Sequence, residues 1–340
     1  AQDQGGRVAR IGVVGGGPFG TAMACVLRRS RHDIVIWARE PEVVSAINRD
    51  AANPQFLPGI ALVPGIAATN DLAATTAGAD FLLLAPPAQR MRSVTTELRP
   101  FLKADLPVVT CSKGIERGTC ALMSQVIAET LPQARLAVLS GPSFANEIAA
   151  DLPAGVTLAC ADLALGEQLA QAIGTPRFCT HLSDDVTGAL LGGALKNVFA
   201  IACGAAFGKK LGNSARSTLI ARALEEMTHL GLAMGARLET FMGMSGIGDL
   251  NLCSYSPTSR NMSLGIALGE GRKLADILAE RITVQEGVHS AESVAELARR
   301  HSVDMPIALA VDQVLNHGAD LDETIARLLS RHGAAPCAGH

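Results

Sequence analysis

The chain has 340 residues, 48% of them hydrophobic, and a formal net charge of -3. This length exceeds one typical domain, and the hydrophobic content is sufficient for two cores. A nearly neutral chain without a basic stripe or an aromatic platform argues against nucleic acid as a partner.

Short apolar strands alternate with helical patterns through the first half of the chain. They are predicted at 8–14, 33–37, 81–85, 106–111 and 135–140. Such runs are typical of parallel strands covered by helices on both faces, so the pattern predicts a doubly wound, Rossmann-like α/β sheet. Two further strand-like runs, 154–160 and 176–181, flank a helical stretch at 163–173.

A glycine-rich turn follows the first predicted strand. Its glycines are Gly15, Gly17 and Gly20, in the pattern G-x-G-x-x-G, and an apolar helix comes next. The first glycine permits the tight turn, the second lets a pyrophosphate approach the backbone, and the third lets helix and strand pack closely. Strand, turn and helix in this order predict a dinucleotide-binding fold.

The end of the second predicted strand bears on the choice of cofactor. NAD-preferring proteins usually place an acid there, but this chain reads Trp37-Ala38-Arg39-Glu40. Arg39 can pair with the 2′-phosphate of NADP through its planar guanidinium, or it is a solvated surface arginine. We therefore expect NADP or NAD as the cofactor, with NADPH favoured.

Polar loops follow two later strands. Lys113, after the strand at 106–111, is a candidate for binding an anionic substrate. After the strand at 135–140, the backbone amides near Gly141 and Ser143 can form an anion-binding turn. Ligands of open parallel sheets bind at the carboxyl ends of the strands, so both loops are expected to face the crevice of the glycine turn. Each loop alone is also compatible with ordinary turn chemistry.

Helical periodicity replaces the strand pattern from about residue 184. Helices are predicted at 184–207, 215–234, 260–269, 273–280, 290–300, 306–316 and 321–330, with loops that include 246–250 and 254–261. The chain is therefore predicted to have a dinucleotide-binding domain at residues 7–183 and an all-helical substrate domain at 184–333.

Lys196 stands alone as a charged residue in the run 186–207. An unpaired buried charge costs several kcal/mol, so a lysine inside a packed apolar helix indicates a chemical use. The alternative is a side chain that snorkels to solvent. The same run is the best transmembrane candidate, but its four glycines, its central charge and its flanks favour a buried helix without membrane insertion.

The cysteines and the first residues bear on the cellular compartment. The eight cysteines are scattered without a C-x-x-C pair or a Cys/His cluster at zinc spacing, which predicts reduced thiols, a cytoplasmic protein and no metal site. Residues 1–6 read as a disordered leader rather than a signal peptide. His181, His229 and His289 have no partner spacing that supports acid/base chemistry.

Several segments together carry a family resemblance. They are GGGPFGTA from Gly15, CSKGIE from Cys111, SGPSFANEIA from Ser140, LKNVFAIACGAAFG from Leu195, NSARSTLIARALEEM from Asn213, GIGDL from Gly246, SRN from Ser259 and VQEGV from Val284. Over nearly its whole length the chain resembles the bacterial NAD(P)-dependent glycerol-3-phosphate dehydrogenases. It departs from them at Pro18-Phe19, where Ser-Tyr is common, and at Pro86-Pro87. Pro18 removes one backbone donor from the turn.

The resemblance implies roles for individual residues. Lys196 corresponds to the proton-transfer lysine, and Asp249 and Lys113 complete the implied catalytic set. Together with the glycine turn, cofactor contacts are expected at Gly15, Gly17, Pro18, Phe19, Gly20, Arg39, Lys113, Ala145, Arg260, Val284 and Glu286. Substrate contacts are expected at Lys113, Gly141, Ser143, Lys196, Asn197, Asp249, Ser259, Arg260 and Asn261. Without the resemblance, Ser259-Arg260-Asn261 reads as a helix cap and Glu286 as a solvent-facing acid.

The implied reaction interconverts dihydroxyacetone phosphate and sn-glycerol 3-phosphate by hydride transfer, and supplies glycerol 3-phosphate for phospholipid synthesis. Lys196 would stabilise charge on the C2 oxygen and donate its proton. Burial and Lys113 would lower the pKa of Lys196, whereas Asp249 would raise it. A homodimer is suggested by analogy alone.

The sequence is also compatible with two other functions. One is a related two-domain dehydrogenase that acts on a 3-hydroxyacid or sugar acid and lacks a phosphate clamp like Arg260. The other is a non-catalytic NADP(H)-binding sensor, against which the joint presence of Lys113, Lys196 and Asp249 argues.

Overall fold

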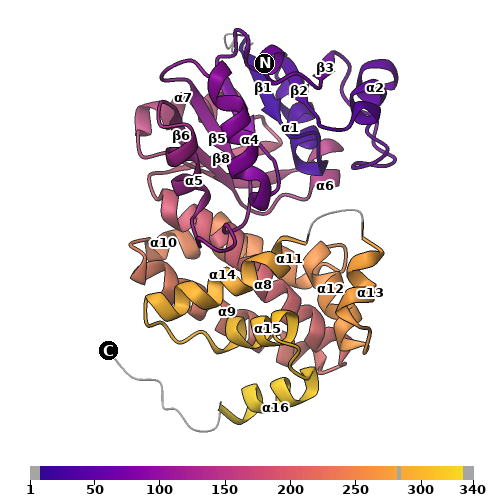
Figure 1. Ribbon diagram of the computed structural model, residues 1–340, viewed down its shortest axis with the longest axis vertical. Helices are drawn as coiled ribbons and strands as arrows, with labels where there is room; N and C mark the ends of the chain where they lie inside the picture. The colour runs from indigo at the N-terminus through magenta and orange to yellow at the C-terminus, as the bar shows by residue number, and fades with distance from the viewer. Residues whose placement is uncertain (1–7, 282–284, 332–340) are drawn as a thin grey trace. The chain divides into compact units, whose positions relative to one another are not determined.

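The computed structural model describes residues 8–281 and 285–331. Packing divides the chain into two compact units (Figure 1). The first contains the residues up to Lys113 together with Ala121–Leu190, and the second contains Gly114–Cys120 together with the residues from Leu191. The division falls inside helix α8 (Val186–Gly208). The domain limits of 7–183 and 184–333 stay a prediction.

An eight-stranded sheet forms the centre of the first unit in its described residues. Its order is β3-β2-β1-β4-β5-β6-β7-β8, and all neighbours are parallel except β6 and β7. The strands are β1 (Arg10–Val14), β2 (Asp33–Trp37), β3 (Ile66–Thr69), β4 (Phe81–Leu84), β5 (Pro107–Thr110), β6 (Arg135–Ser140), β7 (Ala154–Ala159) and β8 (Phe178–Ser183).

The sheet confirms the predicted doubly wound class, with two differences. Strand β3 was not predicted, because only one of its residues, Ile66, is a large apolar side chain. The sheet is parallel, as the predicted class implies, except at β7, which runs antiparallel to β6. The connection between them holds one five-residue helix, α6 (Ala145–Ala149), which packs against α1 (Pro18–Arg29). The chain therefore re-enters the sheet in the opposite direction instead of making a parallel crossover.

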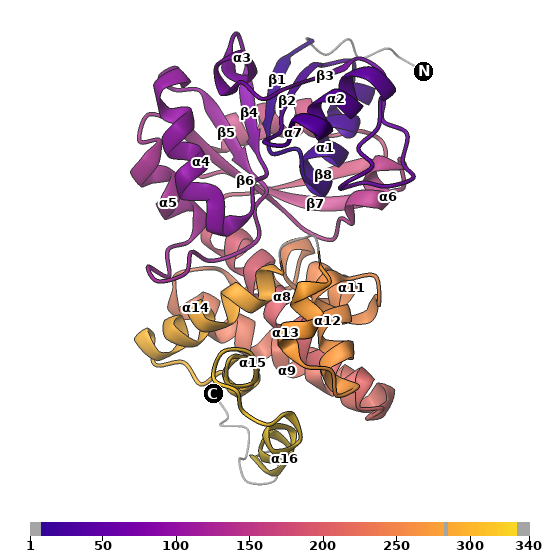
Figure 2. The same ribbon diagram turned by 45° about the vertical axis from the view of Figure 1, so that its right-hand side comes forward.

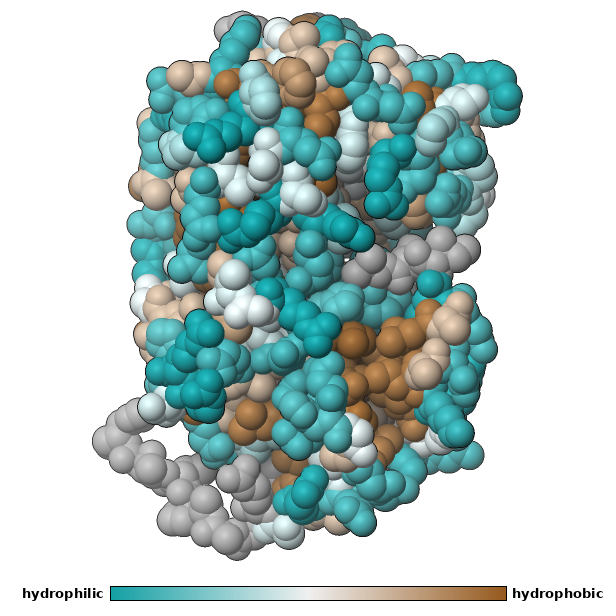
Figure 3. All heavy atoms as spheres, in the orientation of Figure 1, coloured by the Kyte–Doolittle hydropathy of each residue, from teal (hydrophilic) through white to brown (hydrophobic). Residues whose placement is uncertain are grey.

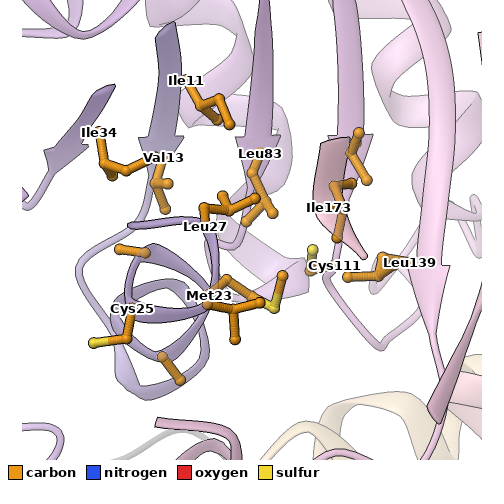
Figure 4. Close-up of a cluster of buried hydrophobic side chains, with 14 of the residues drawn as sticks. Ile11, Val13, Met23, Cys25, Leu27, Ile34, Leu83, Cys111, Leu139 and Ile173 are labelled. Atoms are coloured by element: carbon orange, nitrogen blue, oxygen red, sulfur yellow. The ribbon is translucent and has the colours of Figure 1, made fainter. Parts of the chain in front are cut away.

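Helix α1 supplies the core on one face of this sheet (Figure 4). Ile11 and Val13 alternate along β1 toward Met23 and Leu27 of the helix, as the two-residue period of a strand requires. Gly12 points to the other face, where a Cβ atom would lie 2.4 Å from the Thr75 carbonyl oxygen of α3 (Leu72–Thr76).

The remaining helices of the first unit complete its layers. Helix α3 has α4 (Met91–Leu98) beside it, and α4 packs against α5 (Met123–Thr130) next to β5 (Figure 2). Helix α2 (Pro41–Asp50) lies against β3, and α7 (Leu163–Ile173) joins β7 to β8. Apolar helices therefore cover the strands, which explains why the strands read as short apolar runs.

The second unit is helical in its described residues, as predicted. After α8 it contains α9 (Gly212–Ala233), α10 (Leu238–Phe241), α11 (Asp249–Tyr255), α12 (Arg260–Gly269), α13 (Leu274–Ala279), α14 (Glu286–Arg300), α15 (Pro306–Asn316) and α16 (Leu321–Arg331). Of α8, 89% of the most apolar 18-residue window is buried, although its length and composition would suffice to cross a membrane. This burial identifies it as a core helix.

The predicted loop at 246–250 is wrong, and the predicted loop at 254–261 is shorter than expected. Met244–Gly248 form a π-helical turn that is kinked at Gly246, whose backbone angles are not helical, and that leads directly into α11. Only residues 256–259 separate α11 from α12. A Cβ atom on Gly246 would lie 2.0 Å from the Phe241 carbonyl oxygen. Gly246, one of the two glycines that suggested a loop, is instead required because two backbone segments approach closely here.

Paired glycines bring α8 and α12 into backbone contact. A Cβ atom on Gly204 would lie 2.1 Å from the Met262 carbonyl oxygen, and one on Gly265 would lie 2.1 Å from the Ile201 carbonyl oxygen. Gly208 and Gly269, four residues further along each helix, make the same kind of contact. Residues spaced by four share one face of a helix. This contact fixes the position of α12 against the helix that carries Lys196.

A hydrophobic hollow opens on the second unit beside α15 (Figure 3). Its volume is about 300 Å³, and α8, α9, α12, α15 and α16 contribute to its lining, with residues such as Ile201, Leu219, Val311 and Leu328. Arg222 is the charged residue that borders it. Lys196 does not line this hollow, so the polar cluster described below occupies a different place in the unit.

Candidate active site

The glycines of the turn in the first unit are of two kinds: some are required by the fold, and one leaves space open for a ligand. Gly15 has φ +125°, and a Cβ atom on Gly20 would lie 2.0 Å from the Gly15 carbonyl oxygen. The fold itself therefore requires both glycines. A Cβ atom on Gly17 would meet no atom within 4 Å. Gly17 is thus free of any packing demand, which fits a place kept open for an approaching phosphate at the start of α1.

Asn53, which the sequence analysis missed, supports this turn. It is fully buried, and its Nδ2 donates to the Gly16 carbonyl oxygen at 2.9 Å and to Thr21 Oγ1 at 2.9 Å. A single asparagine outside any motif gives no signal in the sequence. Its amide links the turn to the first helical turn of α1 and so holds the two in register.

Arg39 lies at the end of β2 with its guanidinium accessible. Its side chain is 73% exposed, and its Nη2 is 2.9 Å from Glu40 Oε1. The exposed ion pair is weak enough to be exchanged for a phosphate. Pro18 is the first residue of α1, while Phe19 and Ala145 are partly buried against the core of the unit.

The two predicted polar loops meet within the first unit. Lys113 Nζ donates to the Gly141 carbonyl oxygen at 2.7 Å, and Ser143 Oγ donates to the same oxygen at 3.0 Å. Gly141 has φ +150°, and a Cβ atom there would lie 2.9 Å from the Val156 Cα. Glycine is therefore required at this corner. The structure brings Lys113, Gly141 and Ser143 together, as the sequence predicted.

Lys196 is buried in the second unit beside two side chains of α11. Its Nζ is 3.0 Å from Asp249 Oδ1 and 2.8 Å from Cys253 Sγ. Lys196 is 6% exposed and Asp249 is 1% exposed, so the lysine does not snorkel to solvent. Helix α8 supplies the lysine, and the unexpected helix α11 supplies both partners.

The surroundings of Lys196 set its protonation state. Burial acts to lower the pKa of its ammonium, but attraction to Asp249 and Cys253 outweighs burial and raises the pKa above its ordinary value. Lys196 therefore carries a proton at neutral pH. It can act as a hydrogen-bond donor before it acts as an acid.

A second polar network lies next to this pair. Asn261 Nδ2 donates to Asn197 Oδ1 at 2.8 Å, and the Gly287 amide donates to Asn261 Oδ1 at 3.2 Å. Asn197 follows Lys196 in α8, Asn261 belongs to the first turn of α12, and Gly287 to the first turn of α14. Three helix segments are therefore tied together at one place.

The start of α12 presents the residues expected to bind phosphate. Ser259 is its N-cap, since its Oγ accepts from the Met262 amide at 3.4 Å, and the exposed Arg260 is its first residue. Arg281, which the sequence analysis missed, donates from Nη1 to the Arg260 carbonyl oxygen at 2.8 Å. A helix N-terminus with two guanidinium groups nearby is suited to an anion.

Two expected cofactor residues lie just after this region. Glu286 is the first residue of α14 and is partly buried, so it is not the solvent-facing acid of the alternative interpretation. Val284 lies outside the described residues.

Comparison with known proteins decides between the families that this fold allows. The N-terminal part of NAD-dependent glycerol-3-phosphate dehydrogenase matches residues 10–166, and its C-terminal part matches residues 185–326. The chain belongs to this dehydrogenase family. The two matches together cover most of the chain.

Individual members of the family match over nearly their full lengths. The glycerol-3-phosphate dehydrogenase, NAD(P)+, of Parvibaculum lavamentivorans is 53% identical over 322 residues, which are 95% of this chain and 96% of that protein. That of Rhodospirillum rubrum is 51% identical over 324 residues, covering 95% and 93%. A crystal structure of glycerol-3-phosphate dehydrogenase from Coxiella burnetii matches with a TM-score of 0.91 and 34% identity, over 95% of this chain and 99% of that one.

Proposed function

We propose that this chain is an NAD(P)-dependent glycerol-3-phosphate dehydrogenase in which Lys196 transfers the proton to and from the C2 oxygen of the substrate. Membership of the dehydrogenase family supports the overall activity. The observation that carries the role of Lys196 is its buried ammonium, held 3.0 Å from Asp249. A charge kept in a core and oriented by a carboxylate is suited to acid/base chemistry.

The chemistry at Lys196 follows from its position. The bound nicotinamide supplies or accepts the hydride at C2 of the substrate. During reduction of dihydroxyacetone phosphate, negative charge grows on the C2 oxygen, and the Lys196 ammonium stabilises that charge by a hydrogen bond. The proton then passes from Nζ to the oxygen, which leaves Lys196 neutral and the product a secondary alcohol. Asp249 remains ionised and holds Nζ in place.

The first unit carries the groups that fit the cofactor. The open space at Gly17 and the N-terminus of α1 fit the pyrophosphate. The exposed Arg39 fits a 2′-phosphate, which supports the use of NADPH as well as NADH. Because Pro18 has no N–H group, the turn offers the pyrophosphate one backbone donor fewer than a non-proline residue would.

The start of α12 fits the phosphate of the substrate. Arg260 offers a planar guanidinium, and the capped helix start offers backbone amides. Asn261 would contact the substrate beside Asn197, to which it is already hydrogen bonded. Lys113, Gly141 and Ser143 form the matching set of candidate substrate contacts on the first unit.

The compartment, the use of the product and the assembly of the protein are proposals that go beyond membership of the family. We propose a cytoplasmic enzyme without membrane insertion, since α8 is buried and the described cysteines are free thiols. The product would feed phospholipid synthesis, and a homodimer is the expected assembly by analogy.

A spectrophotometric assay of the full-length protein tests this proposal. NADPH absorbance should fall on addition of dihydroxyacetone phosphate, and a parallel panel of 3-hydroxyacids, sugar acids and their keto forms should give little turnover. Turnover confined to one of those acids would overturn the substrate assignment. Binding of NADPH without turnover of any compound would point to a sensor instead.

A further inference from the structure

The ammonium of Lys196 has an incomplete set of partners. A lysine ammonium carries three N–H donors and no acceptor. Asp249 Oδ1 accepts from one of them and Cys253 Sγ from a second. Among residues 8–281 and 285–331, its ammonium has no further hydrogen-bond or ionic partner. One N–H therefore remains for a substrate.

Cys253 and Asp249 are placed to act on the ammonium together. They are four residues apart on α11, so they share one face of that helix. Cys253 is 4% exposed, and its Sγ donates to Asp249 Oδ1 at 3.6 Å while it accepts from Lys196 Nζ at 2.8 Å. The three side chains thus close a triangle of contacts in which the thiol bridges the cation and the anion.

A single acceptor would not be enough to aim the remaining donor. The lysine side chain is a flexible four-carbon stem, and its ammonium can rotate about the last bond. With Asp249 alone, the flexible stem can pivot about that one hydrogen bond and carry the other two donors with it. A second acceptor at Cys253 stops this rotation, so the direction of the third N–H is defined.

We propose that Cys253 is a positioning residue, which aims the free N–H of Lys196 at the C2 oxygen of the substrate. This inference rests on the proposed function, because it assigns the thiol a part in the same proton transfer. Cys253 acts through Lys196 and does not exchange a proton with the substrate itself.

The pH dependence of kcat distinguishes a positioning role of Cys253 from a purely structural one, because a structural role would not change the pKa of Lys196. Among the described residues, the titratable groups that act on Lys196 are Asp249 and Cys253, both on α11. Burial lowers the pKa of the ammonium, and these two groups raise it. Reduction of the ketone requires the protonated lysine, so activity falls as pH rises through its pKa. Removing the acceptor at Cys253 should therefore move the alkaline limb of the kcat profile to lower pH.

Three variants of the full-length protein test the proposal: Cys253→Ala, Cys253→Ser and, as the matched control, Cys203→Ala. Cys203 is also a buried free thiol of the second unit, 1% exposed on α8, but the hydrogen bonds of the Lys196 ammonium go to Asp249 and Cys253 and not to Cys203. Serine keeps an acceptor and a donor at nearly the same place. The measurements are kcat against pH, KM for dihydroxyacetone phosphate and for NADPH, and thermal unfolding.

The expected result separates kcat from KM. Cys253→Ala should lower kcat about 10-fold. A misplacement of a catalytic group by about 1 Å can cost about 100-fold, and Asp249 should still hold Lys196 to within a smaller displacement. Both KM values should stay within about 2-fold, a difference far below the tenfold that each 1.4 kcal/mol of binding represents. Cys253→Ser should recover most of kcat and the alkaline limb, and Cys203→Ala should match the wild type.

Two results would overturn the role of Cys253 while leaving the proposed function intact. One is a Cys253→Ala profile that coincides with that of Cys203→Ala. The other is a Cys253→Ser variant as slow as Cys253→Ala at equal thermal stability. If Cys253→Ala does not fold, Cys253→Val takes its place, since valine fills the space of the thiol without an acceptor: a kcat well below that of the serine variant supports the proposal, and an equal kcat contradicts it. Wild-type turnover of dihydroxyacetone phosphate is read independently and tests the function itself.

Discussion

The two units build their candidate sites from different parts of the chain. In the first unit the candidate site is made largely of backbone, because Gly15 and Gly20 of the cofactor turn, and Gly141 of the loop after β6, occupy places where a side chain would collide with neighbouring main chain. In the second unit the site is made of buried side chains, with Lys196 and Asp249 paired in a helical core. The site of the first unit therefore depends on glycines that lack a Cβ atom, and the site of the second unit depends on two buried charged side chains.

This difference determines how each site can fail. A backbone turn is lost when any side chain is added, largely without regard to its chemistry. A buried charge pair is lost when one partner is removed, because the other charge then remains buried without compensation. Substitutions should therefore act through sterics in the first unit and through charge in the second.

The largest effect is expected at Lys196. Lys196→Ala should lower kcat at least about 100-fold, the usual lower scale of acid/base catalysis. NADPH binding, measured by fluorescence, should change little, since the lysine serves the proton transfer. Lys209→Ala, which removes a partly buried lysine paired with the exposed Asp322, is the matched control and should keep normal turnover. Normal turnover in the Lys196 variant would show that Lys196 does not transfer the proton.

A buried acid outside the site offers a second test of charge in the helical unit. Glu226 accepts from the Ile307 and Ala308 amides at 2.8 and 3.1 Å, at the start of α15, and burial raises its pKa to about 7. Because the folded-state pKa exceeds the ordinary value, stability is full below about pH 4.5 and declines as pH rises to about 7. The expected loss is about 3 kcal/mol.

Denaturant unfolding between pH 5 and pH 8 measures this decline. Glu226→Gln should flatten it, whereas Glu225→Gln, a change in the neighbouring exposed ion pair with Arg222, should leave it in place. Equal pH slopes in the wild type and the Glu226 variant would show that this carboxyl does not titrate in the folded protein near neutrality.

In the first unit, two glycines of the same turn should respond differently. Gly20→Ala should destabilise the protein by about 1–3 kcal/mol, because the new methyl collides with backbone. Gly17→Ala should cost less than about 1 kcal/mol of stability, as a change at a helix N-cap, yet weaken NADPH binding. Thermal unfolding and fluorescence titration separate the two effects. Stable Gly20→Ala protein with normal NADPH affinity would contradict the steric account.

The smallest effect is expected at Arg39. Arg39→Ala should raise KM for NADPH about 10-fold, as expected for the loss of one charge-assisted hydrogen bond, and change KM for NADH far less. Arg49→Ala is the matched control, since Arg49 is 75% exposed and pairs with Asp50 just as Arg39 pairs with Glu40. Equal changes for both cofactors would show that Arg39 does not read the 2′-phosphate.

The same difference explains what could be predicted from the sequence. The spacing of the glycines reflects steric requirements between residues close in the sequence, so the turn at Gly15 could be predicted together with its strand and helix. Strand β3 was missed because small residues dominate it, and Asn53 because its partners come from a distant turn. The pairing of Lys196 with Cys253 depends on a contact between α8 and α11, two helices that are distant in the sequence, and no local pattern encodes such a contact.

The loop predicted at 246–250 was wrong because of one glycine, Gly246. In Gly246-Ile247-Gly248, low helix propensity suggested a loop, whereas the structure uses Gly246 for a close backbone approach inside a π-helical turn. Propensity describes an isolated segment, and tertiary contact overrides it here. Asp249 consequently lies on a helix, one turn before Cys253.

The glycine contact between α8 and α12 has a consequence for how the enzyme responds to heat. Main-chain atoms meet at Gly204 and Gly265, so no side-chain rotamers can redistribute to let the two helices slide apart by degrees. The distance between Asn197 and Asn261 is therefore either kept or lost altogether. We expect no gradual loss of catalytic activity on warming, and we expect activity to be lost at the temperature at which the helical unit unfolds cooperatively.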